Sequence, residues 1–400
     1  MHMSLEGVLW PNIYLLTTIG IWPLPSNATT VSRLFTYFRI FLHVTLECTI
    51  IMGLIYTIWV NWGNIFILSD CSSIIFSHFL IVFKFTYIIL HRHSCIQVLN
   101  KLKEFWEISQ EEKERQCFEY FAIWGKTVTI SCAITGFANV ITFFLTAIFN
   151  EFKYQRADNQ TDMRRILIID TLYGFDYQQS PVFEILIIWQ MMTLMGALTS
   201  VVATDCTAMS IILHLTGQFA LISARLRAIG KETCREKIPH VNGDVMVIEI
   251  RRCIAHHQHV IRVTDELNAI IGPMATVHVL TAGLIICTNG YSLIKSDNCS
   301  EIEIIKFAGY FICMIIQLSL WCWSGELLIQ ESRAIAQTVF LEISWFTFPT
   351  TVQRDLILIV LRSQKQCQIV SFLQIMCRRK ITEVFNTAAS YLALLRSIQE

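Results

Sequence analysis

The sequence predicts an all-α membrane protein with seven transmembrane helices, its N-terminus in the cytosol and its C-terminus outside the cell. Three observations predict this class. The 400 residues are 54% hydrophobic and only 16% charged, whereas soluble globular proteins are usually about 25% charged. Long apolar runs recur along the chain, and the Lys and Arg residues between them favour one side. So much apolar surface cannot be buried in one aqueous core, so a lipid bilayer is expected to cover it.

Seven apolar runs are long enough to cross a bilayer. They lie at residues 34–60, 65–90, 121–149, 183–204, 270–294, 302–329 and 381–398. The helical pattern of the fourth run continues to residue 229. At about 1.5 Å per residue it should project well beyond the membrane. The last run is barely long enough and contains many small and polar residues, as expected of a helix packed in a bundle or lining water.

The runs divide the chain into four parts. We expect a cytosolic surface segment at 1–33, a six-helix membrane domain at 34–329, a cytosolic anchor segment at 330–380, and a seventh helix with the extracellular C-terminus at 381–400. The anchor segment carries Pro349 and a predicted helix over 353–362.

Lysine and arginine counts set the orientation. The segments after the second, fourth and sixth runs carry five, eight and seven of these residues, whereas the loops on the other side carry six in all. Because positive charge stays in the cytosol, the N-terminus is predicted to be cytosolic. The sequons at Asn159 and Asn298 then lie outside, where glycosylation can occur, and the sequon at Asn27 is a chance match.

Several protein classes are disfavoured by composition. The formal net charge is zero, so no basic surface is predicted to bind nucleic acid. The fourteen cysteines are scattered without a CxxC pair, which argues against a disulfide framework or a zinc site. His256, His257 and His259 are clustered, but metal binding would require further ligands, and an interfacial helix face explains them better. No nucleophile motif, phosphate loop or catalytic carboxylate pair is found, so neither an enzyme nor a cofactor is expected.

Charged residues within the runs should point into the bundle. Arg39, His43 and Glu47 share one face of the first run at four-residue spacing, with Glu47 placed to neutralise a neighbour. Lys84 and Asp205 are expected to pair with each other or to contact helix ends.

Short motifs in the N-terminal two thirds resemble those of the insect odorant receptor family. Residues 20–23 (GIWP) are similar to the family's Gly-Leu-x-Pro turn, and residues 253–261 (CIAHHQHVI) resemble its stretch before the fifth span. The family's Asp…His-Leu…Leu run is similar to Asp205, His214, Gln218, Phe219 and Leu226.

The C-terminal third carries the densest resemblance. Residues 361–365 (LRSQK) are similar to the family's Leu-x-Arg-Ser-Gln-Lys motif, and Ser344-Trp345 ends a run that begins at residues 324–326 (SGE). The family's closing Phe…Ser-Tyr…Leu-Leu pattern resembles Phe385, Ser390, Tyr391, Leu394 and Leu395. Each motif is short, and the order that they share carries the resemblance.

The resemblance implies a subunit of a ligand-gated, non-selective cation channel in the plasma membrane of olfactory sensory neurons. Such subunits form tetramers, usually mixed with a coreceptor subunit, and the last helix lines the pore. A small volatile odorant binds in the outer half of the membrane domain. The coreceptor's long insertion between spans four and five is lacking, because residues 231–259 are short. The chain therefore resembles an odour-tuned subunit.

Two alternative functions were weighed. A gustatory-type receptor channel shares the topology, but its usual terminal Thr-Tyr-x-x-x-x-x-Gln pattern is replaced by Ser390-Tyr391 followed by Ser397. A metabotropic receptor acting through G proteins has the opposite orientation. Its Asp-Arg-Tyr and Asn-Pro-x-x-Tyr motifs are also lacking after span three and in span seven.

A site for a volatile ligand must combine buried apolar area with one or two polar contacts. Methionine and aromatic side chains suit a pocket that adapts to ligand shape. His78 and Asn139 are the expected polar contacts, although hydrogen bonds between helices explain them equally well. Taken singly, such side chains are more often plain core. The candidate lining is Ile75, His78, Phe79, Gly136, Asn139, Val140, Phe143, Ile187, Met191, Leu194, Met195, Tyr291, Tyr310, Phe311 and Met314.

The resemblance also implies pore residues in the last helix, positioned by Ser390 and Tyr391. Leu394 and Ile398 fall where the family places hydrophobic gate residues, and Ser397 falls near a pore-lining polar position. Leu394 and Ile398 are four residues apart and so share a helix face, and a ring of such side chains closes a pore by dewetting. The alternative is that they pack against an adjacent subunit.

The orientation predicts that the loop at residues 151–181 is extracellular. An epitope tag inserted in this loop should stain intact cells that express the chain. Staining that requires permeabilised cells would reverse the topology.

Overall fold

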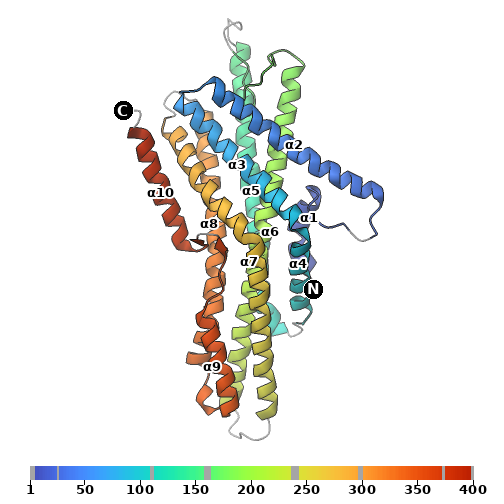
Figure 1. The fold of residues 1–400 in the computed structure, drawn as a ribbon, viewed down its shortest axis with the longest axis vertical. Coiled ribbons are helices and arrows are strands. Elements are labelled where there is room, and N and C mark those ends of the chain that lie inside the picture. Colours follow the sequence, from blue (N-terminus) through green and yellow to red (C-terminus); the bar gives the residue numbers. More distant parts are fainter. Residues whose placement is uncertain are drawn as a thin grey trace.

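The helices of the chain lie mostly along one long axis (Figure 1). The structure, a computed structural model, describes residues 5–24, 27–108, 112–156, 164–235, 243–295, 301–371 and 374–397. Its α-helices are α1 (Leu5–Thr18), α2 (Thr30–Val60), α3 (Ile65–Leu90), α4 (Arg92–Ile108), α5 (Glu112–Arg156), α6 (Val182–Arg235), α7 (Gly243–Ile294), α8 (Glu301–Gln337), α9 (Thr350–Gln364) and α10 (Arg378–Ser397).

Six of these helices are long and apolar enough to cross a membrane: α2, α3, α5, α6, α7 and α8 in the described part of the chain. The helix α3 has the bounds that the sequence predicts, and the others are longer. The 54 residues of α6 span about 80 Å, against about 30 Å for the hydrocarbon layer. The helix α6 is therefore much longer than one membrane crossing requires, and its extension beyond the membrane stays a prediction.

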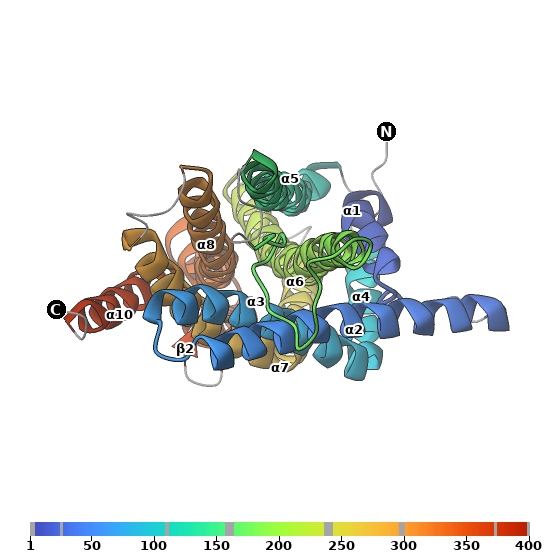
Figure 2. The same cartoon turned by 90° about the horizontal axis from the view of Figure 1, so that it is seen from above.

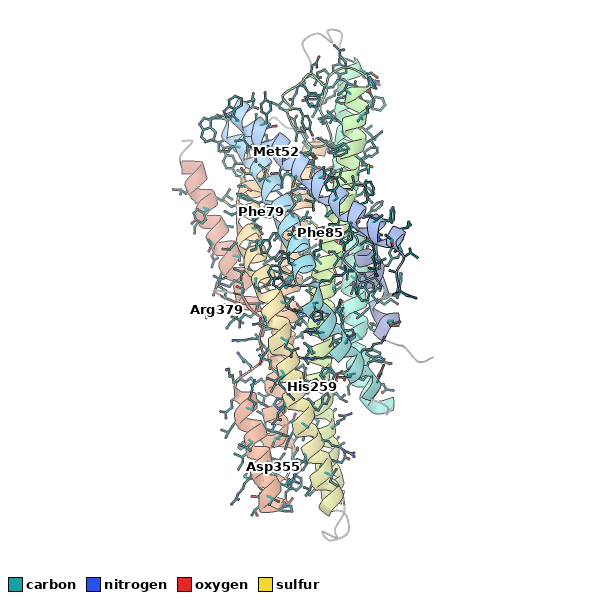
Figure 3. The ribbon with its side chains drawn as sticks, turned by 45° about the vertical axis from the view of Figure 1, so that its right-hand side comes forward. Met52, Phe79, Phe85, His259, Asp355 and Arg379 are labelled. Atoms are coloured by element: carbon teal, nitrogen blue, oxygen red, sulfur yellow. The ribbon has the colours of Figure 1, made fainter. Side chains whose placement is uncertain are left out.

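The lower part of the molecule in Figure 1 contains the C-terminal part of α6, the N-terminal part of α7, the end of α8 and α9. His259 and Asp355 mark this part in Figure 3. Ion pairs hold its elements together. Arg227 of α6 contacts Glu342, just after α8, at 2.7 Å, and Arg251 of α7 contacts Asp355 of α9 at 3.6 Å. The helix predicted at 353–362 is observed as α9.

A polar residue caps the start of α3. The Asn64 side chain accepts hydrogen bonds from the backbone N–H groups of Phe66 and Ile67 at the start of α3. Gly63 has φ of +100°, a conformation that glycine adopts without strain. The four-residue connection at 61–64 is thus short enough to reverse the chain and place α3 against α2.

Two apolar cores position the candidate sites. The main core follows α6, α7 and α8, and it includes Phe219, Ile285 and Trp321, all with no exposed surface. The second core lies toward the upper end in Figure 1. There Ile50 and Leu54 of α2 pack with Ile169, which belongs to the connection between α5 and α6.

The last helix follows a short two-stranded segment, called the joint below, that α8 and α7 hold in place. A two-stranded antiparallel sheet of β1 (Val370–Ser371) and β2 (Gln374–Ile375) precedes α10. Asn268 of α7 accepts a hydrogen bond from the Val370 backbone N–H at 2.8 Å, and Glu326 of α8 accepts one from Arg378 at 3.2 Å. Seen from above, α10 stands at one side, away from α5 and α6 (Figure 2).

Glycine lets the joint pack closely on α8. A Cβ atom at Gly325 would lie 2.3 Å from the Met376 carbonyl oxygen, whereas one at Gly283 of α7 would lie 3.8 Å from the Val384 side chain of α10. Gly325→Ala should therefore displace the start of α10 and cost about 1–3 kcal/mol. Gly283→Ala is the matched control, because 3.8 Å is ordinary van der Waals contact.

Thermal unfolding of the purified protein in detergent measures this difference. We expect a lower melting temperature for Gly325→Ala and an unchanged or raised one for Gly283→Ala. Equal melting temperatures for the two variants would contradict the close packing of the joint.

Candidate ligand cavity and last helix

A cavity of about 140 Å³ lies between α3, α5, α6 and α8. Each helix contributes side chains at positions i, i+3, i+4 and i+7, which is one helix face. An apolar cavity of about 150 Å³ in another protein is large enough to bind benzene. The lining is Ile74, Ser77, His78, Leu80 and Ile81 from α3; Gly136, Asn139, Val140 and Phe143 from α5; Leu194, Ala197, Leu198 and Val201 from α6; Tyr310, Cys313, Met314 and Gln317 from α8; and Ile169.

Eight of the predicted ligand residues line this cavity: His78, Gly136, Asn139, Val140, Phe143, Leu194, Tyr310 and Met314. The other seven do not. Ile75, Ile187 and Met191 pack against the second core, and Tyr291 is buried elsewhere.

Phe311 packs against the main core. Phe79 (Figure 3) and Met195 are exposed on the outside of α3 and α6. Because lipid-facing and core-facing residues of a membrane helix are both apolar, hydropathy does not distinguish these positions.

Ten lining residues were not predicted, and periodicity could have found several of them. Ile74 and Ile81 lie four residues before and three after His78, on the same helix face. Ala197, Leu198 and Val201 follow Leu194 in the same way. Ile169 had another signal, since residues 166–169 (ILII) form an apolar run inside a polar connection.

The polar groups of the cavity wall are largely bonded to one another. His78 Nδ1 lies 2.5 Å from Glu47 Oε2 of α2, and both residues are almost completely buried. The Ser77 and Tyr310 hydroxyls are hydrogen-bonded, and Tyr310 also donates to the Ser73 carbonyl oxygen at 3.3 Å. Glu47 therefore contacts a polar partner inside the bundle, as the sequence predicts.

A buried charge network borders the cavity at Gln317. Gln317 donates a hydrogen bond to Asp205 of α6, and Lys84 Nζ of α3 contacts the other Asp205 oxygen at 2.6 Å. The same Nζ lies 3.1 Å from His278 Nδ1 of α7 and 5.6 Å from the Trp321 ring centre. The network thus joins the cavity wall to α7, and the expected pairing of Lys84 with Asp205 is observed.

The connection between α5 and α6 folds back against the bundle and contributes Ile169 to the cavity wall. Gln190 of α6 accepts a hydrogen bond from the Ile169 N–H at 2.9 Å and donates to the Ile169 carbonyl oxygen at 3.1 Å. The Leu172 N–H donates to Thr57 of α2 at 2.7 Å.

A second, polar cavity of about 220 Å³ lies on the other side of residues 168–169 and is lined partly by Asp70 and Lys306.

The helix α10 presents two different faces. Val384 and Ala388 are buried toward the bundle. Leu392 lies on the same side, since a Cβ atom at Gly290 of α7 would lie 3.9 Å from its side chain. The opposite face is exposed, small and polar, and consists of Thr382, Asn386, Ala389, Ser390 and Ala393.

The predicted pore residues lie on or beside this exposed face. Ser390 is exposed, and Tyr391 and Leu394 are more than half exposed. Tyr391 and Leu394 also line a groove of about 790 Å³ between α10, α7 and α3. Ser397 ends α10, and neither its side chain nor Ile398 belongs to the described part of the chain.

Three other predictions concern glycans and histidines. Asn159 and Asn298 lie outside the described residues. His256 and His259 pack against the Phe105 ring with centroid distances of 5.5 and 4.8 Å. Within the described ranges, no group of three or more His, Cys, Asp or Glu side chains is arranged to hold a metal ion.

Comparison with known proteins decides the family. A sequence model described as 7tm Odorant receptor matches residues 64–376, which is more than half of the chain. The chain belongs to the odorant receptor family. Its relatives are insect odorant receptors, so the predicted receptor class is confirmed and an enzyme is excluded. The match also selects an odorant receptor over the gustatory alternative.

Individual relatives of this odorant receptor are distant. Odorant receptor 47b of Drosophila melanogaster is 26% identical over 189 residues, which are 47% of this chain and 44% of that protein. Odorant receptor 82a of the same species is 20% identical over 340 residues, covering 83% of this chain and 84% of that protein. The chain thus matches less than half of the first relative and most of the second.

A solved structure confirms the all-α membrane fold. The insect olfactory receptor OR5 from Machilis hrabei, in complex with eugenol, superposes with a TM-score of 0.80 over 98% of both chains. Sequence identity is 12%, so the likeness concerns the fold. A second structure of OR5 gives a TM-score of 0.74.

The charge network beside the cavity predicts strong coupling between Lys84 and Asp205. Lys84→Met or Asp205→Leu alone leaves the other charge buried without its partner, at a cost of about 3–5 kcal/mol. The double variant replaces both charges by apolar groups and should recover most of that loss. Melting temperatures of the four proteins in detergent measure the coupling. If the losses of the single variants simply added in the double variant, the pair would not act as a unit.

Proposed function

We propose that this odorant receptor is an odour-tuned subunit of a ligand-gated, non-selective cation channel. A small apolar volatile binds in the cavity between α3, α5, α6 and α8, and binding opens a pore lined by α10. The observation that carries the proposal is the mostly apolar cavity, whose wall connects through Gln317, Asp205, Lys84 and His278 to α7. The fold also fits, since OR5 holds eugenol on a similar scaffold.

Coupling from the cavity to the pore would pass through α7. This helix carries His278 of the charge network beside the cavity, and Val279, the next residue, lines the groove beside α10. The sheet before α10 is also bound to α7 through Asn268. A ligand that changes the positions of α3, α6 and α8 would therefore change the support of α10.

The exposed face of α10 suits a water-filled pore. Its small and polar side chains would be poorly placed against lipid. The face would be covered when four subunits assemble around a common axis, usually with the family's coreceptor as the partner subunit. The lower part of the molecule would form the cytosolic anchor of that tetramer, and the sequons at Asn159 and Asn298 would be extracellular.

The experiment that tests the function is an inside-out patch recording from cells that express this chain with an insect odorant receptor coreceptor. Volatiles applied without nucleotides should evoke cation current. Tyr310→Ala should change the ranking of the volatiles, because Tyr310 lines the cavity, whereas Met191→Ala should preserve it. A response that requires nucleotides, or a ranking moved only by Met191→Ala, would contradict the proposal.

The gate is predicted at Leu394. Leu394 is more than half exposed at the edge of the groove beside α10, whereas Leu392 lies about 200° from Leu394 around the helix and packs near Gly290 of α7. Leu394→Ser should wet the closed pore and raise the basal current, because hydrated ions then no longer meet an apolar ring. Leu392→Ser is the matched control and should leave the basal current unchanged at equal surface expression. A leak from Leu392→Ser alone would mean that α10 presents a different face to the pore.

A further inference from the structure

We propose that the cavity selects volatiles that carry a hydrogen-bond acceptor oxygen, such as ketones, aldehydes and esters, and that the His78 Nε2–H group recognises this oxygen. The inference rests on the proposed function and adds the chemical class of the ligand. It is carried by two buried donors in the cavity wall, on His78 and Asn139, and by the contact between His78 and Glu47.

Glu47 is completely buried beside His78. Its side chain has no exposed surface, and its Oε2 lies 2.5 Å from His78 Nδ1. The His43 Nδ1 is farther away, at 3.9 Å from Oε1. A single uncompensated charge is very costly inside the apolar bundle, so the group must be neutral overall.

Two neutral arrangements of the close pair leave no buried proton unpaired, and they agree on the proton at Nε2. An acid proton on Glu47 Oε1 is disfavoured, because this atom has no hydrogen-bond partner. If Glu47 is a carboxylate, His78 is an imidazolium and both of its nitrogens carry protons. If Glu47 is a carboxylic acid, it donates its proton to Nδ1, and the single proton of the neutral imidazole lies on Nε2. In both cases Nδ1 is engaged by Glu47, and Nε2–H is the donor left for the cavity.

A third arrangement places the positive charge on His43. It is disfavoured because His43 Nδ1 lies beyond hydrogen-bond distance of Glu47. The His43 Nε2 atom is also buried without a hydrogen-bond partner, so an imidazolium there would leave a buried N–H unsatisfied.

The remaining polar groups of the wall point to the same ligand chemistry. The Ser77 and Tyr310 hydroxyls bind each other and the Ser73 carbonyl oxygen. The Gln317 amide donates to Asp205. The Asn139 Nδ2 atom is buried and has no hydrogen-bond partner. The cavity thus offers N–H donors at His78 and Asn139, and a carbonyl oxygen would satisfy a donor that a hydrocarbon leaves unpaired.

Matched ligand pairs test the preference for a carbonyl oxygen directly, in cells that express the chain with a coreceptor. Acetophenone and α-methylstyrene differ only in C=O against C=CH₂, as do 2-heptanone and 2-methyl-1-heptene, and aliphatic pairs of five to ten carbons extend the set. For each pair that evokes current, we expect the carbonyl compound to be about tenfold more potent, the size of one net hydrogen bond in a buried site.

Three variants locate the effect. His78→Phe should bring the potency ratio of each pair close to one. His78→Phe leaves Glu47 buried alone, which destabilises the fold. The double variant Glu47→Met/His78→Phe removes both polar groups and should show the same loss of preference. Ser77→Ala is the matched control, since its hydroxyl is already bound within the wall, and the ratio should persist. Surface biotinylation confirms equal expression.

The results of these recordings distinguish a wrong ligand class from a wrong receptor function. Equal potency within pairs in the wild-type receptor, currents from hydrocarbons alone, or a ratio that survives in the double variant would overturn the ligand class while the receptor function stands. No current from any volatile, with the complex at the cell surface, would overturn the proposed function and this inference together.

Discussion

A buried charge in the bundle must find a partner, and this constraint fixes how the helices lie against one another. Lys84 of α3 reaches Asp205 of α6, and the same lysine lies beside His278 of α7. Glu47 of α2 reaches His78 of α3. Because these groups are buried, a rotation of any one helix would leave a charge unpaired at a cost of several kcal/mol. The two contacts therefore also fix the side chains that face the cavity between them.

The sequence predicts the architecture far better than it predicts the cavity. Helix positions follow from apolar runs, and α3 matches its predicted bounds. On α5, the four predicted residues are the full set that lines the cavity, since Gly136 and Asn139 stand out in an apolar helix. On α3 and α6 the predicted face is partly rotated outward, so that Phe79 and Met195 are exposed.

The physical reason is that hydropathy identifies which residues lie within the membrane but not which side of a helix faces the bundle. Lipid and protein core are equally apolar, so both sides have similar residues. Polar residues indicate which face of a helix points into the bundle, but only where the partners of these residues are known. His78 was identified as polar and inward, but its bond to Glu47 of another helix depends on the packing of α2 against α3. The position of Ile169 in the cavity wall depends in the same way on Gln190, which lies in the following helix.

The central claim is that ligand binding in the cavity opens the pore beside α10. Cryo-electron microscopy of the complex with coreceptor, with and without an activating volatile, tests it most directly. The account predicts ligand density between His78, Asn139 and Tyr310, together with a wider pore at Leu394 than in the unliganded complex. Ligand density confined to the groove between α7 and α10, or an unchanged pore radius with the cavity filled, would contradict it.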